Sequence, residues 1–139
     1  MADLVLDAWA IMAWLKGQQP AADKVRVLLD TAERHQGERN LVMSIINLGE
    51  VFYLSVTARD LAYGERVLEN LRSRIAIVSA SDEAVMSASK LKARYAISYA
   101  DAFAAATAME RQLPLVTGDP ELRAMAQQEK ALKLEWIAG

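Results

Sequence analysis

Residues 4–15 have the sequence Leu-Val-Leu-Asp-Ala-Trp-Ala-Ile-Met-Ala-Trp-Leu. The apolar run Leu4–Leu6 is followed by a single carboxylate, Asp7, and then by an apolar segment of helical length. This order predicts a buried strand that leads directly into a helix. Because strand-to-helix loops lie at the carboxyl edge of a parallel sheet, the pattern places Asp7 at that edge.

A second copy of this pattern lies further along the sequence. The run Leu113–Thr117 and Gly118 precede Asp119, which stands before Pro120, a residue favoured at the first position of a helix. Asp7 and Asp119 are therefore candidates for helix N-caps, which accept hydrogen bonds from free backbone N–H groups. Capping alone would explain either residue, and a ligand-binding role at the sheet edge is the alternative.

Strand and helix patterns alternate along the rest of the chain. Further apolar runs predict strands at Leu41–Met43, Ile75–Val78 and Leu132–Ile137, and we expect the first four of the five strands to be buried. Longer segments suit helices at Trp9–Lys16, Ala21–His35, Ile45–Val56, Arg59–Arg72, Asp82–Tyr95, Ser98–Gln112 and Pro120–Gln128.

Strands separated by helices cannot pair as hairpins. We therefore predict a three-layer α/β fold with a central, mainly parallel sheet of about five strands flanked by helices. The 139 residues are expected to form one domain, since a chain of this length can bury a core without disulfide or zinc staples. Ligands of such sheets bind at the carboxyl ends of the strands, near the point where the strand order reverses.

Composition restricts the chemistry that the chain can perform. It has no Cys and one His, and 16 Lys and Arg oppose 18 Asp and Glu, for a net charge of −2. These counts exclude thiol nucleophiles, disulfides, Cys/His zinc sites and a two-histidine acid–base pair. His35 precedes Gly37 at a polar helix end, where a solvated cation explains it without catalysis. Carboxylates, hydroxyls, Lys or Arg must carry any catalysis.

The sequence predicts a cytoplasmic protein without a membrane span. Residues 1–15 contain two acids, no basic segment and no apolar run near the ~20 residues that a spanning helix needs. The net charge argues against overall attraction to nucleic acid but allows a local basic surface. Basic residues gather at Arg59, Arg66, Arg72 and Arg74 and at Lys90, Lys92 and Arg94, as solvated helix faces or as contacts for an RNA backbone.

Two further carboxylates stand in apolar surroundings. Asp101 is the only charged residue in segment 96–109, and Glu50 is the only one in segment 43–57. Exposure on the wet side of a helix would satisfy either residue, whereas burial would raise its pKa. If both converge with Asp7 and Asp119, their mutual repulsion is tolerable only with a cation between them.

Such a convergence predicts a divalent-cation site. Oxygen ligands alone favour Mg²⁺ or Mn²⁺. A cation of this kind can bind a phosphodiester oxygen, lower the pKa of a coordinated water and stabilise the leaving 3′-oxygen, as in nucleases. The hydroxyl of Thr117 could orient the water or an oxygen of Asp119.

The order of these motifs resembles the PIN domain over nearly the whole chain. The matching residues are Leu6-Asp7 after the first strand, Asn47-Leu48-Gly49-Glu50 in the third helix, Asp101-Ala-Phe-Ala-Ala-Ala in the sixth helix and Val116-Thr117-Gly118-Asp119 after the fourth strand. The length and the pairs of helices are similar to the VapC-type toxins of bacterial toxin–antitoxin systems.

This resemblance implies a metal-dependent endoribonuclease that uses Mg²⁺ or Mn²⁺ and is inhibited by a cognate antitoxin. Asp7, Glu50, Asp101 and Asp119 would form its acidic quartet. The chain departs from the family pattern at Ala8 and Trp9, where Ser, Thr or Asn is usual, and at Leu122, where an aromatic residue is common. These departures concern substrate choice or metal geometry more than the fold.

Apolar residues surround almost the whole circumference of the first predicted helix. They are Trp9, Ile11, Met12, Trp14 and Leu15. One sheet face buries only one stripe of a helix, so part of this set should lie under another helix or face a partner. With Val51–Tyr53, the set would suit a homodimer surface or an antitoxin groove.

A nuclease is not the only function that an α/β fold can support. A module on the same fold that binds RNA or protein without cutting it is the alternative, and Ala8 and Trp9 are its support. A phospho-receiver domain is excluded because Val78 is followed by Ser79-Ala80 and the required Lys after the last strand is missing. A dinucleotide-binding domain needs glycines after its first strand, and segment 4–9 has none.

Overall fold

The computed structural model describes residues 3–34 and 40–139. His35, which we expected at a helix end, lies outside the described residues. The strands are β1 (Leu4–Leu6), β2 (Leu41–Ser44), β3 (Ala76–Val78), β4 (Leu115–Thr117) and β5 (Leu134–Trp136). All of their pairings are parallel, in the order β3-β2-β1-β4-β5. The predicted five-stranded, three-layer α/β fold is confirmed, and the sheet is parallel throughout.

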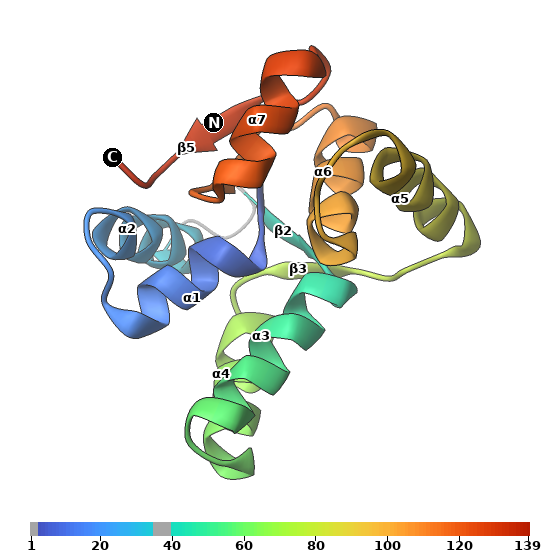
Figure 1. The fold of residues 1–139 in the computed structure, drawn as a ribbon. Helices are drawn as coiled ribbons and strands as arrows, with labels where there is room; N and C mark the ends of the chain where they lie inside the picture. Colours follow the sequence, from blue (N-terminus) through green and yellow to red (C-terminus); the bar gives the residue numbers. More distant parts are fainter. Residues whose placement is uncertain (1–2, 35–39) are drawn as a thin grey trace.

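Two helices follow each of the first three strands, and one follows β4 (Figure 1). The helices of the described residues are α1 (Ala8–Lys16), α2 (Ala21–Arg34), α3 (Ile45–Ala58), α4 (Leu61–Arg72), α5 (Asp82–Arg94), α6 (Tyr99–Arg111) and α7 (Pro120–Gln128). None of them combines the length and the apolar character that crossing a membrane requires.

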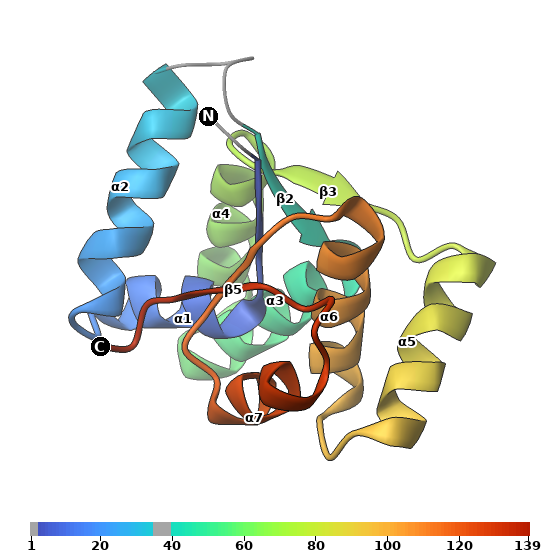
Figure 2. The same ribbon diagram turned by 90° about the horizontal axis from the view of Figure 1, so that it is seen from above.

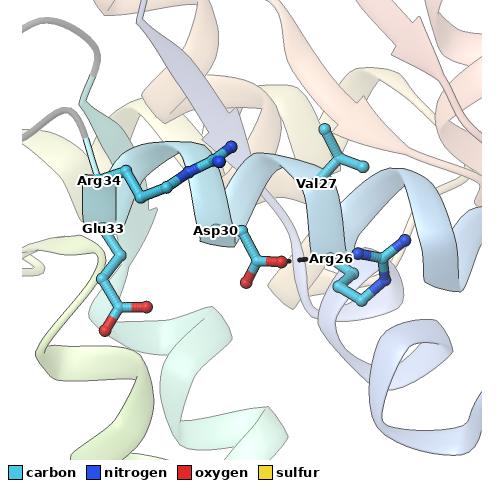
Figure 3. Close-up of a pocket in the computed structure, with 5 residues that line it drawn as sticks. All are labelled: Arg26, Val27, Asp30, Glu33 and Arg34. Carbon is cyan, nitrogen blue, oxygen red and sulfur yellow. Dashed lines mark ion pairs between the residues drawn. The ribbon is translucent and has the colours of Figure 1, made fainter.

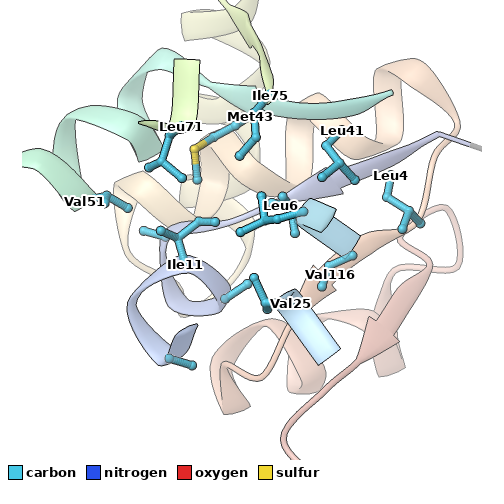
Figure 4. Packing of buried hydrophobic residues seen from close by; sticks show 14 of the residues in the cluster. Leu4, Leu6, Ile11, Val25, Leu41, Met43, Val51, Leu71, Ile75 and Val116 are labelled. Atoms are coloured by element: carbon cyan, nitrogen blue, oxygen red, sulfur yellow. The ribbon is translucent and has the colours of Figure 1, made fainter. Parts of the chain in front are cut away.

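Alternate residues of the strands build two separate cores. Leu6 and Met43 belong to a cluster with α1–α4, part of which is seen in Figure 4, whereas Val5, Val42 and Leu115 pack with α5–α7. Figure 2 shows α2 and α5 on opposite sides of the strands. This split follows from the two-residue period of a strand, whose successive side chains point to opposite faces. Burial of both faces explains the continuous apolar runs in the sequence.

The direction of the strand order reverses at β1. From β1 the chain proceeds outward through β2 to β3, and α5 and α6 then carry it back to β4 on the other side of β1. Leu6 is the register partner of Val116, so the ends of β1 and β4 lie side by side. The loops after these two strands lead to helices on opposite faces of the sheet, because α1 packs in the first core and α7 in the second. Asp7 and Asp119 come from these two loops.

The expectation that the third predicted strand is buried is wrong. Ala76 is exposed, and Ile77 and Val78 are only partly buried, whereas Ile75, which precedes β3, is buried. The reason is that β3 pairs only with β2 and therefore forms an edge of the sheet. Pairing order is a tertiary property that the local sequence does not contain.

The helices α3 and α4 form an arm that extends away from the strands (Figure 1). Their close approach depends on Gly64, where a Cβ atom would lie 2.4 Å from a methyl carbon of Val56. Tyr53, Leu54 and Leu61 are exposed on this arm, whereas Val51 is fully buried.

The apolar helix α1 packs mainly into the core. Ile11 is fully buried, and Trp9, Met12, Trp14 and Leu15 are partly buried against the first cluster. Covering by a neighbouring helix, one of the two expectations for this set, therefore accounts for most of its apolar surface.

Candidate functional site

Asp7 is fixed at the end of β1 by two hydrogen bonds. Its side chain is 1% exposed and caps α1, with Oδ1 accepting from the Ala10 N–H at 2.8 Å. Its Oδ2 accepts a hydrogen bond from the hydroxyl of Thr117, the last residue of β4. The capping interpretation of Asp7 is therefore confirmed, and the same carboxylate also links the two adjacent strands.

The Thr117 hydroxyl also organises the loop that carries Asp119. While it donates to Asp7, its Oγ1 accepts a hydrogen bond from the Asp119 N–H at 3.0 Å. Asp119 in turn caps α7, because its Oδ1 accepts from the Glu121 N–H at 2.9 Å. One buried hydroxyl thus fixes the positions of two acidic residues relative to each other.

Trp9 packs directly on this loop. A Cβ atom at Gly118 would lie 2.3 Å from two carbons of the Trp9 ring and 2.8 Å from the Ala138 Cβ, so residue 118 must be glycine in this arrangement. The aromatic residue that departs from the family pattern therefore covers the backbone next to Asp119. We did not foresee this role, because nothing in the local sequence connects the two positions.

Asp101 enters the site from the first turn of α6. Ser98 caps this helix by accepting the Asp101 N–H at 3.1 Å, and the Asp101 side chain is 9% exposed. Burial, a hydrogen bond to the Asp119 carboxylate and the negative charges of Asp119 and Asp7 raise the pKa of Asp101 to about 8. At neutral pH the Asp101 carboxyl therefore tends to keep its proton.

The pKa of Asp7 is raised as well, to about 7. Burial is the main cause, and the negative charges of Asp119 and Glu50 add to it. The hydrogen bonds from Thr117 and Ala10 act in the opposite direction by stabilising the carboxylate. The raised pKa values of these two acids show that full ionisation of the group is unfavourable at this edge unless a cation is bound.

Glu50 lies on α3 at the periphery of this group. Partial burial and the negative charge of Asp119 raise its pKa, so its carboxylate lies within electrostatic range of the site. One turn earlier on α3, the Asn47 side-chain amide donates to the Ala100 carbonyl at 3.0 Å, which ties α3 to the start of α6. The helix that carries Glu50 is therefore fixed next to Asp101.

The tightest acidic cluster of the described residues includes a side chain that we did not predict. Asp101, Asp119 and Glu121 each place one carboxylate oxygen within 4.8 Å of the other two. Asp7 and Glu50 are not members of this cluster. Glu121 gave no signal in the sequence, because acids are common in the first turn of any helix.

This donor set fits a hard divalent cation. All of its ligand atoms are oxygens, which suits Mg²⁺ or Mn²⁺. In the part of the chain that the structure describes, no Lys or Arg forms an ion pair with Asp7, Asp101, Asp119 or Glu50. A bound cation would supply the positive charge that the protein itself does not place there.

A hollow on the surface of α2 is less suited to chemistry (Figure 3). Its charged residues neutralise one another, as in the ion pair of 3.5 Å between Arg26 and Asp30. It contains none of the acids at the end of β1 and β4.

Comparisons with known proteins agree with this architecture. The sequence model of the PIN domain matches residues 4–128. A search of curated protein sequences found no match.

Solved structures of similar fold include chains of two toxin–antitoxin complexes. A chain of VapBC2 from Rickettsia felis, bound to a promoter DNA fragment, has a TM-score of 0.70 and 18% identity over 97% of this chain and 98% of that chain. A chain of DNA-bound VapBC from Salmonella typhimurium has a TM-score of 0.69 and 19% identity over the same shares.

A third similar structure is that of a toxin. VapC20 from Mycobacterium tuberculosis, described as a Sarcin-Ricin loop cleaving toxin, has a TM-score of 0.70 and 13% identity over 88% of this chain and 94% of that chain. At these identities the likeness concerns the fold.

The raised pKa of Asp101 predicts how its removal affects stability. An acid whose pKa is higher in the folded state stabilises the fold at pH values below its unfolded pKa of about 3.8, and this contribution is lost as pH rises through about 8. In chelator, Asp101→Asn should therefore gain stability relative to the wild type between pH 5 and pH 8. Urea unfolding at several pH values measures this difference.

Asp82→Asn, at the exposed start of α5, is the control for that series. Marked destabilisation by Asp101→Asn at pH 8 would instead identify Asp101 as a structural partner.

The contact between Trp9 and Gly118 predicts a non-additive pair of substitutions. Gly118→Ala should cost roughly 1–3 kcal/mol in the wild type, because its Cβ overlaps the Trp9 ring, and less when Trp9→Ala has removed that ring. Denaturant unfolding of the single and double variants measures the coupling. Gly49→Ala is the control, since nothing lies within 4 Å of its Cβ position and Ala favours a helix. Equal costs in both backgrounds would contradict the packing role.

Proposed function

Because the chain belongs to the PIN-domain family, we propose that it is a metal-dependent endoribonuclease and the toxin of a bacterial toxin–antitoxin pair. The observation that carries this proposal is the meeting of Asp101, Asp119 and Glu121 beside Asp7 at the carboxyl ends of β1 and β4. The VapC-like fold supports it. The alternative is a module on the same fold that binds RNA or protein without cleavage.

The acidic residues have the proposed role of holding Mg²⁺ or Mn²⁺. Asp101, Asp119 and Glu121 offer oxygens close enough to share one ion. The carboxyl groups of Asp7 and Glu50 lie within electrostatic range of Asp119 and would add to the attraction for that ion. When bound, such an ion lowers the pKa of a coordinated water and stabilises the charge that develops on the leaving oxygen.

The remaining task of the protein is to hold these acids in position. Thr117 holds Asp7 and the Asp119 loop in fixed relation, so ligand oxygens need little rearrangement. Asp101 binds its proton with a pKa of about 8, so a cation that binds there near neutral pH would have to displace this proton. The burial of Asp7 and Asp101 limits access of bulk water to the acids.

The proposed partners are an RNA substrate, an antitoxin that occludes the acidic site and a second copy of the chain. The chain would act in the cytoplasm, where RNA is available. Tyr53, Leu54 and Leu61 are exposed on the α3–α4 arm, and they are the proposed homodimer contact. Val51, which we expected in this surface, packs in the core instead.

Divalent-ion dependence of RNA cleavage tests the proposed activity. The purified protein should cleave RNA in Mg²⁺ or Mn²⁺ and lose this activity in excess EDTA, because the site offers no other electrophile. Asp7→Asn, purified in parallel, should be inactive and thereby control for contaminating nucleases. Undiminished cleavage in EDTA by the wild type alone would contradict the mechanism, and metal binding without cleavage of any RNA would favour the non-cleaving module.

Tyr53→Asp tests the dimer contact. Tyr53 is 56% exposed, so the substitution should leave the fold intact and reduce the mass measured by light scattering towards that of a monomer. Met86→Asp makes the same kind of change at an exposed apolar residue of α5, outside the arm, and should leave the mass unaltered. A folded Tyr53→Asp variant with the wild-type mass would remove this surface from the interface.

A further inference from the structure

A cavity of about 240 Å³ lies beside the acidic cluster. One wall comes from residues 94–97, which connect α5 to α6, and the other comes from α7. Glu121 lines this cavity and also belongs to the cluster with Asp101 and Asp119. The cavity and the candidate metal site are therefore adjacent, with Glu121 belonging to both.

We propose that this cavity binds one unpaired nucleotide of the RNA, next to the phosphate that lies at the acidic cluster, and that Arg94 contacts the phosphate of that nucleotide. This inference rests on the proposed function and adds a substrate-binding position to it.

The size and lining of the cavity suit a single base. Its volume is below the ~300–1,000 Å³ of pockets that take drug-sized ligands, so a base fits better than a folded partner. Ile97 and Met125 are buried and give the cavity an apolar floor, while Gln128 and Glu121 are exposed and offer polar groups at its rim. An unpaired base has the same character, with apolar faces and a polar edge.

Arg94 has the freedom to bind a phosphate. Its side chain is 67% exposed, and its guanidinium lies 3.9 Å from Glu129 and 5.2 Å from the centre of the Tyr95 ring. Besides this long ion pair with Arg94, Glu129 has two hydrogen-bond donors, because the Tyr95 hydroxyl donates to its Oε2 at 2.9 Å and the Ala131 N–H donates to its Oε1 at 3.3 Å. The guanidinium therefore keeps donors available for a phosphate, which it can bind through two parallel hydrogen bonds.

The charged side chains that line the cavity determine where the phosphates of a bound RNA strand can lie. Among the described residues that line the cavity, Arg94 is the only cationic side chain, and Glu121, which also belongs to the acidic cluster, is the only anionic one. A backbone phosphate is repelled by the acids unless a cation is present, and it is attracted to Arg94. One phosphate at the metal site and the next at Arg94 would place the intervening base in the cavity.

The test is binding of a labelled single-stranded RNA, followed by fluorescence anisotropy in Ca²⁺, with gels to verify that the RNA stays intact. Arg94→Gln should weaken binding roughly tenfold. Lys92→Gln makes the same charge change on the same helix outside the cavity and should have a much smaller effect. Mn²⁺ affinity should be unchanged in both variants, because neither residue belongs to the acidic cluster.

A second variant tests the base position directly. Ala124→Trp places a bulky ring in the cavity from the exposed side of α7. In the wild type, an abasic nucleotide at one position of the RNA should weaken binding. In Ala124→Trp the intact and abasic RNAs should bind equally, because the base can no longer enter.

Each contrary outcome has a distinct meaning. Equal binding by Arg94→Gln and Lys92→Gln, or an unaltered preference for the intact RNA in Ala124→Trp, would overturn the nucleotide site. Weaker antitoxin binding by Arg94→Gln with unchanged RNA binding would assign the cavity to the antitoxin and would also overturn the nucleotide site.

If the wild type binds RNA as expected but does not cleave it in Mg²⁺ or Mn²⁺, the proposed function fails and the nucleotide site stands. A wild type that binds no RNA overturns both.

Discussion

The burial of several carboxyl groups at one edge of the sheet is the constraint on which this structure depends. The parallel pairing of β1 with β4 brings Asp7 and Asp119 to one edge, and α6 adds Asp101. Burial and mutual repulsion raise the pKa values of Asp7 and Asp101 to about 7 and about 8. Hydrogen bonds from Thr117 and a helix cap prevent Asp7 from relaxing away. The fold thus holds together a group of carboxyls whose ionised form a divalent cation would stabilise.

The remainder of the fold explains how this arrangement persists. Two cores on opposite faces of the sheet hold the strands, so their ends are fixed from both sides. Trp9 covers Gly118 and restrains the loop before Asp119, while Asn47 ties α3 to α6. These contacts are apolar or neutral. They therefore hold the acids in place without cancelling the charge on which metal binding would rely.

Local patterns predicted the parts of the site that depend on short segments. Asp7 and Asp119 were recognisable because a strand, a cap and a helix follow one another in sequence, and Asp101 was recognisable as a lone charge in an apolar helix. The sequence could not rank Glu50 against Glu121, because their distances to the other acids depend on how α3 and α7 pack. The edge position of β3 and the contact of Trp9 with Gly118 are likewise tertiary and leave no local trace.

Calorimetric titration with Mn²⁺ at pH 6 and pH 8, in buffers of different ionisation enthalpy, tests the central claim most directly. A cation that binds to these carboxylates must displace protons from Asp101 and Asp7, whose pKa values are about 8 and about 7. The account predicts saturable binding that releases protons and is tighter at pH 8 than at pH 6. Absence of binding, or binding that releases no protons and has the same affinity at both pH values, would contradict it.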